Sequence, residues 1–211
     1  MTVFQTPAPI DIITEIGLGT VTVVAAERGD TVVEIRPADA GKKDDVKAAG
    51  QLKVDFSDGT LTVNMPKGWR VIGPSGKGAV EVIIEAPVGS RLNGNLAHGT
   101  FRTAGDLGES SVEVAAGEIL VGRAVAAVTA KTAQGDITIG EAVRGVLRLE
   151  TSVGDLRVGI HPGSAARVQS NTSRGAVNNQ LGPVDPSNDD LVEVYAHTAS
   201  GNVVIGHATT V

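Results

Sequence analysis

Cysteine is absent from this chain of 211 residues, and aromatic residues make up only 2% of it. Without cysteine the protein forms no disulfide and has no thiolate chemistry. The shortage of rings suits a thin core between two sheets. It also leaves few rings for the aromatic platforms on which enzymes that cleave polysaccharides hold sugars: the chain has one Trp (Trp69), one Tyr (Tyr195) and three Phe.

A strong positive charge is also lacking, since the formal net charge is −6 and the sequence pI is about 5.2. This balance argues against a surface for nucleic acid or for anionic membranes. No window approaches the 18 apolar residues of a membrane span, so we expect no membrane insertion. The first 17 residues lack a basic start followed by an apolar run, so we expect a cytoplasmic protein.

Glycine, by contrast, is abundant, with 27 residues, and hydrophobic residues make up 41% of the chain. Many glycines together with Val, Ile, Ala and Thr, and no long helical period, indicate an all-β protein with many turns. The length is sufficient for one domain with a sizeable core, so we predict a single domain over residues 1–211.

A short phrase recurs around six glycines that are 18 to 26 residues apart. The residues two and four places after each glycine are apolar in ten of twelve cases, as at Ile137 and Ile139, and those between them are mixed. The residues before the glycine alternate in the same way. Each copy therefore predicts a strand, a sharp turn and a second strand, both half-buried. The six glycines are Gly99, Gly117, Gly135, Gly154, Gly175 and Gly201.

Two all-β architectures are compatible with this repeat. In a parallel β-solenoid, or β-helix, each copy is one rung and equivalent residues stack. In an antiparallel β-sandwich or meander, each glycine belongs to a tight hairpin, which favours Asn-Gly or Asp-Gly. The residue before the glycine is Ala116 in one copy and Val153 in another. Because these residues suit such a hairpin poorly, we predict the solenoid and keep the sandwich or meander as the alternative.

The same phrase also surrounds Gly19 and Gly59, which gives eight copies in all. The early copies are about forty residues apart, so residues 1–90 are expected to form irregular long rungs with extra strands. Residues 91–211 are expected to form regular rungs of 18–26 residues. The loop at 182–190, which contains Pro183 and Pro186, is a candidate contact surface.

The last copy in the sequence ends at Gly206, and no capping helix follows it. An open last rung exposes unpaired backbone groups. Two outcomes are open: end-to-end association with another copy of the chain, or a tail that folds over the last rung.

Three acidic residues, Glu118, Asp136 and Asp155, each follow a turn glycine directly. Stacked in a row, their carboxylates could hold Ca²⁺. The preferred interpretation is turn chemistry, because Asp and Asn favour such corners and bond to nearby backbone. A second row, of threonines, has the inward parity and predicts an internal ladder bonding along the stack. Its members are Thr132, Thr151, Thr172 and Thr198.

Other chemistry-bearing motifs are weak. The four histidines, His98, His161, His197 and His207, lack metal-ligand spacing. The glycine-rich stretch 73–78 lacks the pattern of a phosphate-binding loop. No set of acid, base and nucleophile can be assembled. We therefore expect no enzyme activity, no catalytic residue and no cofactor.

The phrase T-x-x-G-D-[IL]-x-[IV]-G, found at 132–140 and 151–159, resembles the bacterial putative-adhesin family of β-strand repeats, whose function is unknown. The resemblance implies a solenoid-like all-β fold and supplies no catalytic residues. The resulting hypothesis is a non-enzymatic protein-interaction or scaffold protein whose partner is another protein. The alternative is a carbohydrate-binding or carbohydrate-active β-helix protein.

Overall fold

The computed structural model describes residues 1–65, 78–182 and 190–208. The described chain is mostly strands, with one helix, α1 (Lys43–Gln51), so the protein is all-β as predicted. The predicted contact loop at 182–190 and the stretch 73–78 lie largely outside the described residues. The strands are β1 (Thr2–Gln5), β2 (Asp11–Ala26), β3 (Asp30–Pro37), β4 (Lys53–Ser57), β5 (Thr60–Asn64), β6 (Val80–Pro87), β7 (Arg91–Ala104), β8 (Ser110–Ala124), β9 (Val128–Gln134), β10 (Ile137–Ala142), β11 (Gly145–Val153), β12 (Leu156–Ile160), β13 (Ala165–Arg174), β14 (Val177–Asn179), β15 (Leu191–Ser200) and β16 (Val203–His207).

The strands form where side chains alternate between the core and the surface. In β8, Val112 and Val114 are buried before the turn glycine, and Ile119 is buried after it. Glu113, between the two valines, is exposed. This period of two is the pattern of a strand with one face in the core. The predicted inward positions of the repeat are therefore the buried ones in this copy.

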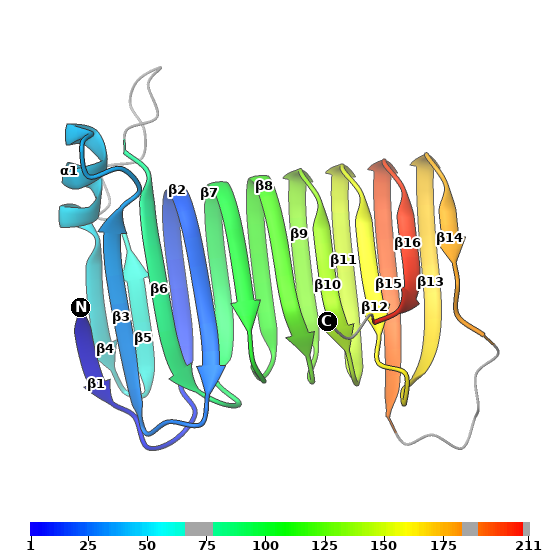
Figure 1. The fold of residues 1–211 in the computed structure, drawn as a ribbon, viewed down its shortest axis with the longest axis horizontal. Coiled ribbons are helices and arrows are strands. Elements are labelled where there is room, and N and C mark those ends of the chain that lie inside the picture. The colour runs from blue at the N-terminus through cyan, green and yellow to red at the C-terminus, as the bar shows by residue number, and fades with distance from the viewer. Residues whose placement is uncertain (66–77, 183–189, 209–211) are drawn as a thin grey trace.

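Strands before and after the glycines build two ladders, which Figure 1 shows as strands stacked along the long axis of the molecule. One ladder contains β9, β11, β15 and β13, and the other contains β10, β12, β16 and β14. The long strands β2, β7 and β8 run through their glycine turns and belong to both ladders, which joins them into one large mixed sheet. Every pair described between β7 and β16 is parallel, so the alternative of an antiparallel meander is not found there.

The end of the sheet that carries the N-terminus is built differently. Here β1 pairs antiparallel with β3, β3 with β6, and β4 with β5. The rings of Phe4 and Phe56 pack 5.3 Å apart between β1 and β4. Helix α1 lies beside β3 and β6 at the same end (Figure 1). It has 9 residues, and no helix in the described ranges is long and apolar enough to cross a bilayer.

The copy around Gly59 does not follow the other seven. Asp58 and Gly59 have φ values of 49° and 74°, and they join the antiparallel strands β4 and β5. Positive φ at both central residues is the geometry of a two-residue hairpin, which Asp-Gly favours. Of the eight copies of the phrase in the sequence, seven have a stacked turn glycine and the Gly59 copy is a hairpin.

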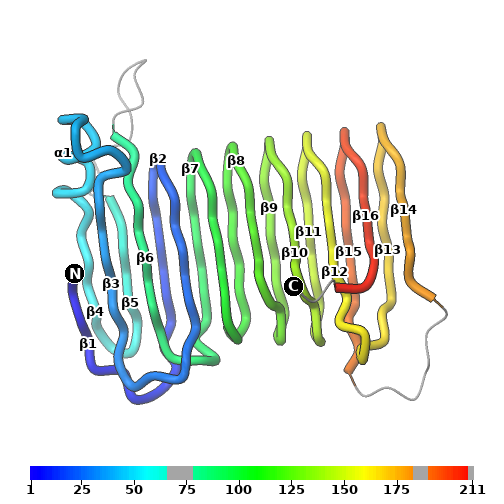
Figure 2. Tube along the Cα trace, in the orientation of Figure 1, coloured from blue at the N-terminus to red at the C-terminus, as the bar shows by residue number. Residues whose placement is uncertain are grey.

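The order of the last copies in space differs from their order in the sequence. Strand β15 pairs with β11 on one side and β13 on the other, and β16 lies between β12 and β14. The Gly201 copy is thus inserted between the Gly154 and Gly175 copies, as Figure 2 shows by the red strands inside the orange ones. The expectation that the copy ending at Gly206 is the outermost one is wrong; the outermost copy is β13–β14.

The core is a narrow column of aliphatic side chains from both ladders. The largest fully buried side chain is Phe101, whose ring lies over Gly94 of the same copy. A Cβ at Gly94 would be 2.5 Å from the ring, so the core accepts a phenyl group only where the facing residue has no side chain. This pairing shows how little room the column leaves for rings.

A pair of neighbouring substitutions tests the inward and outward assignment. Ile137 is fully buried, whereas Thr138 is half-buried on the opposite face of β10, between two strands. We expect Ile137→Asp to cost several kcal/mol and to unfold the protein, because it buries an unpaired charge. Thr138→Asp should cost under about 1 kcal/mol. Urea unfolding followed by circular dichroism measures both, and equal losses would overturn the assignment.

Candidate functional site

The turn glycines form a column along one edge of the two ladders. Seven of the eight predicted glycines share a left-handed φ between 130° and 152°. A Cβ on any of them would overlap a backbone carbonyl oxygen of the neighbouring strand; for Gly117 that oxygen belongs to Gly99. Only glycine combines this φ with such a close approach. The seven are Gly19, Gly99, Gly117, Gly135, Gly154, Gly175 and Gly201.

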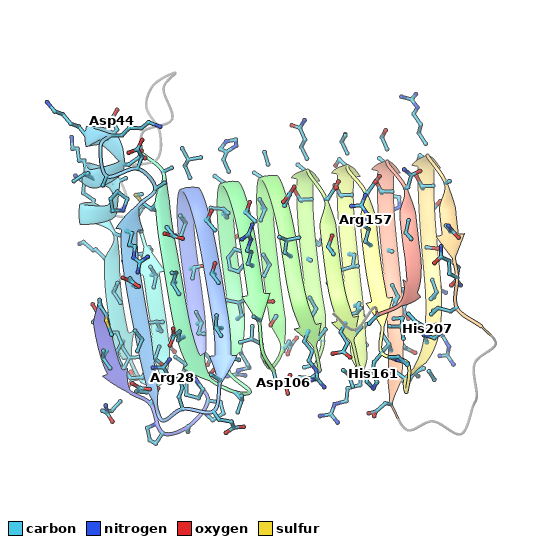
Figure 3. All side chains as sticks on the ribbon, in the orientation of Figure 1. Arg28, Asp44, Asp106, Arg157, His161 and His207 are labelled. Carbon is cyan, nitrogen blue, oxygen red and sulfur yellow. The ribbon has the colours of Figure 1, made fainter. Side chains whose placement is uncertain are left out.

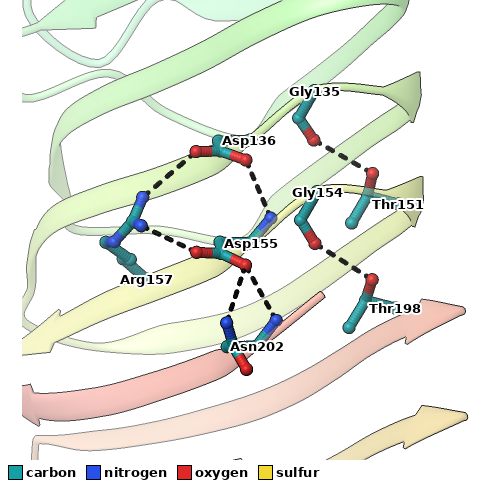
Figure 4. Close-up of polar contacts among 8 residues, drawn as sticks. All are labelled: Gly135, Asp136, Thr151, Gly154, Asp155, Arg157, Thr198 and Asn202. Atoms are coloured by element: carbon teal, nitrogen blue, oxygen red, sulfur yellow. Dashed lines mark hydrogen bonds and ion pairs between the residues drawn. The ribbon is translucent and has the colours of Figure 1, made fainter. Parts of the chain in front are cut away.

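The threonine row points inward and bonds along the stack to these carbonyls. Thr151 Oγ1 donates to the carbonyl oxygen of Gly135 at 3.0 Å, and Thr198 Oγ1 donates to that of Gly154 at 3.0 Å (Figure 4). Thr132 and Thr172 make the same bond to Gly117 and Gly201. Each hydroxyl therefore donates its hydrogen bond to the backbone of the adjacent copy and not to another threonine.

The carboxylate row lies on the outside of the same turns. Asp136 Oδ1 accepts the backbone N–H of Asp155 at 2.8 Å, and Asp155 Oδ1 accepts that of Asn202 at 2.8 Å. Asn202 Oδ1 in turn accepts the N–H of Ala176 at 3.1 Å. Each Asp or Asn side chain thus bonds to the backbone of the following copy. The series ends at Ala176, which has no side-chain acceptor.

Arg157 occupies the remaining oxygens of the two aspartates. Its guanidinium lies 3.2 Å from Asp136 Oδ2 and 2.8 Å from Asp155 Oδ2 (Figure 4). Within the described ranges, no group of three His, Cys, Asp or Glu side chains is placed to hold a metal ion. This geometry favours the turn interpretation for Asp136 and Asp155. Within the described residues, the Glu118 side chain makes no comparable hydrogen bond to the backbone of an adjacent copy.

The opposite edge of the sheet carries alternating charges. Arg123 lies 3.5 Å from both Asp106 and Glu141, and Glu141 Oε1 lies 2.6 Å from His161 Nδ1. Figure 3 shows Asp106 and His161 along the lower edge of the view. These are exposed or half-exposed pairs, which contribute little to stability.

Three groups near the N-terminal end have shifted pKa values. A hydrogen bond from Arg28 holds the pKa of Asp30 below its usual range, and the same bond raises the pKa of Arg28. Arg28 also pairs with Glu85 on β6, which ties the β2–β3 turn to that strand. A hydrogen bond to Asp11 raises the pKa of Arg91. These groups are surface ion pairs that join strands.

A hollow of about 500 Å³ lies on the outer face of β9, β11, β15 and β13. At its centre Tyr195 is 37% exposed, and the Arg148 guanidinium carbon lies 5.6 Å from the centre of its ring. This site is not predicted from the sequence, because its residues become neighbours only through the inserted Gly201 copy. The lining residues are Lys131, Arg148, Leu149, Glu150, Gln169, Ser170, Asn171, Tyr195, Ala196 and His197.

Three comparisons with known proteins give one set of matches. No family model matches the chain, and no curated protein matches it. Among solved structures, a putative cell adhesion protein from Clostridium sporogenes has a TM-score of 0.47 at 13% identity, covering 98% of each chain. A putative adhesin from Bacteroides fragilis has a TM-score of 0.42 at 11% identity, covering 97% of this chain and 95% of that one. One from Parabacteroides distasonis has a TM-score of 0.39 at 13% identity, covering 96% and 94%.

The glycine column can be tested at one turn. We expect Gly117→Ala to cost at least about 2 kcal/mol, because alanine would be strained at a φ of 138° and its Cβ would overlap the Gly99 carbonyl. Gly17→Ala is the matched control, since no atom lies within 4 Å of the added carbon there. The control should change the unfolding free energy by less than about 1 kcal/mol. Similar losses in both variants, measured by urea unfolding, would contradict the close stacking.

The two interpretations of the carboxylate row predict different behaviour of Asp155. Asp155→Ala should cost about 1 kcal/mol, because the Asn202 N–H loses its acceptor. Asp155→Asn keeps that acceptor and should cost less. Added CaCl₂ should leave the melting temperature of the wild type unchanged relative to EDTA. A calcium-dependent rise in melting temperature that Asp155→Asn abolishes would instead establish the calcium site.

Proposed function

We propose that this chain is a parallel β-solenoid that works as a non-enzymatic interaction or scaffold protein. Its two ladders support this architecture, since copies from Gly99 onward stack in parallel and in register. The glycine column supports it as well, because close backbone stacking at every turn leaves no freedom to slip by one residue. In such a rigid ladder, recognition falls to the sides, loops and ends.

The observation that carries the interaction role is the outer edge formed by β13 and β14. In the described part of the chain, β13 pairs only with β15, and β14 pairs only with β16. Their other sides present unpaired N–H and C=O groups, which can add a strand from another protein. With 10 residues, β13 is longer than the edge strands at the other end, which have 4 residues in β1 and 5 in β4. Short edges resist pairing, so the long edge is the one suited to a partner.

The side chains of the outermost copy, β13–β14, are compatible both with exposure to water and with contact to a partner. Two inward positions that are apolar in the other late copies are Ser170 and Asn179 here, and Asn179 is exposed. Val177 is 45% exposed. A free chain can therefore leave this end in water without exposing a broad apolar surface. This composition supports binding through backbone hydrogen bonds to another protein, a second copy of the chain included.

Proline substitutions at the edge test the proposal. Ala165 N donates to Asp190 on the inner side of β13, and N–H groups alternate along a strand, so the N–H of Ala166 faces outward. In the other edge strand, the N–H of Gln180 donates inward to the carbonyl oxygen of Ile205. By the same alternation, the N–H of Val177 faces outward. Ala166→Pro/Val177→Pro removes two outward donors. We expect it to fold and to lose at least tenfold in partner binding.

Arg167→Pro is the control, because it removes an N–H that faces β15 and should destabilise the end of the sheet. Binding is measured by tagged pull-down from the native cells, and light scattering reports whether the partner is a second copy. Equal capture by the wild type and the double variant would refute the edge. A monomer with no stable partner would refute the interaction role.

A further inference from the structure

The hollow on the outer face consists of two rows of side chains from three neighbouring strands. Arg148, Tyr195 and Gln169 are paired residues across β11, β15 and β13 and form one row. Glu150, His197 and Asn171 form the second row, two residues further along. Neighbouring strands are about 4.8 Å apart, so the six side chains form a compact grid. We call this grid the outer panel.

Tyr195 gives the outer panel an apolar surface. Of the rings in the described residues, Phe101 is buried and Phe4 and Phe56 are half-buried against each other, whereas the Tyr195 ring lies on the open face of the sheet. Arg148 lies over the ring at 5.6 Å, which fixes its orientation by a cation–π contact. The chain thus places its single tyrosine outside a core that has few rings.

Around this ring the outer panel offers hydrogen-bonding groups that the protein itself does not use. Gln169, Asn171 and His197 make no side-chain hydrogen bond within residues 1–65, 78–182 and 190–208, and none of them belongs to an ion pair there. Each amide both donates and accepts, and the neutral imidazole does the same. Glu150, which also pairs with Lys131, adds a further acceptor, and Arg148 adds donors. Mixed groups of this kind, spaced a few ångströms apart, match neighbouring hydroxyls.

We propose that the outer panel binds a carbohydrate, with the C–H face of one sugar ring against the part of Tyr195 that Arg148 leaves exposed and its hydroxyls bonded to the surrounding amides. An exposed ring with a few convergent polar groups, in a shallow and open hollow of about 500 Å³, suits a sugar that lies against the surface. This gives the carbohydrate-binding alternative a specific site, in which one exposed ring takes the place of the broader aromatic platform for which the composition leaves few rings.

Other ligand classes fit the outer panel less well. A phosphate or sulfate group is held best by several unpaired cations, but of the two cations that line the hollow, Lys131 lies 3.2 Å from Glu150, which leaves Arg148 alone. An extended peptide adds to a sheet through a free edge, and β11 and β15 are paired on both sides. The neutral, hydroxyl-rich ligand is the one whose chemistry this grid matches.

A glycan array followed by calorimetry tests the proposal. The wild type should bind a neutral oligosaccharide, and Tyr195→Ala should weaken binding at least tenfold while leaving the melting temperature unchanged. Tyr195→Phe keeps the ring and should stay within about threefold of the wild type. Asn93→Ala is the matched control, because Asn93 has the same position relative to its turn glycine, on the distant strand β7, and is exposed. It should bind like the wild type.

Three outcomes would overturn the site. The first is an array on which the wild type binds no glycan. The second is binding that Tyr195→Ala leaves unchanged. The third is binding only to sulfated or phosphorylated glycans that Lys131→Gln removes. If Tyr195→Ala does not fold, Gln169→Ala/Asn171→Ala replaces it, with the same tenfold loss expected. None of these positions is changed in the proline variants of the β13–β14 edge, so the two proposals fail independently.

Discussion

The close approach of backbone to backbone at the glycine turns is the contact on which the rest of the structure depends. At Gly117 the chain passes the Gly99 carbonyl with no room for a side chain. This contact fixes the position of each copy on the next, and two other rows follow from it. The inward threonine three residues before the glycine reaches the carbonyl of the adjacent glycine, as Thr151 reaches Gly135. The residue after the glycine is placed where its side chain meets the next backbone N–H, as Asp136 meets Asp155.

Much of this arrangement could be predicted from the sequence, because it depends on local pattern. Alternation gave the inward positions such as Ile137 and Val158, which are buried. The turn rule that disfavours hairpins at Val153-Gly154 also marks Asp58-Gly59, and that pair is indeed a hairpin turn between antiparallel strands. By this rule the Gly59 copy differs from the others already in the sequence. The solenoid remains the proposed interpretation of the stacked copies.

The order of the last two copies could not be predicted from alternation or period, because both copies have the same parity and either could lie outermost. A different signal was present in the row after the glycines. In sequence order that row reads Asp136, Asp155, Ala176 and Asn202, so a residue without an acceptor interrupts it. In spatial order the acceptors are continuous and Ala176 ends the row. Tyr195 could not be recognised as part of a site for the same reason, since its neighbours depend on this order.

The polarity of the inward positions gives a physical reason for the insertion. Placed in sequence order, the Gly175 copy would bury Asn179 between Val158 and Ile205, and a buried amide without partners costs several kcal/mol. At the end of the stack Asn179 is exposed, and its Oδ1 accepts the N–H of Leu181 at 3.1 Å. Val203 and Ile205 of the inserted copy are fully buried instead. The same exchange places Tyr195 and His197 between Arg148 and Glu150 on one side and Gln169 and Asn171 on the other. The burial preference of a few core positions therefore places β13–β14 at the outer edge and brings together the three strands of the outer panel.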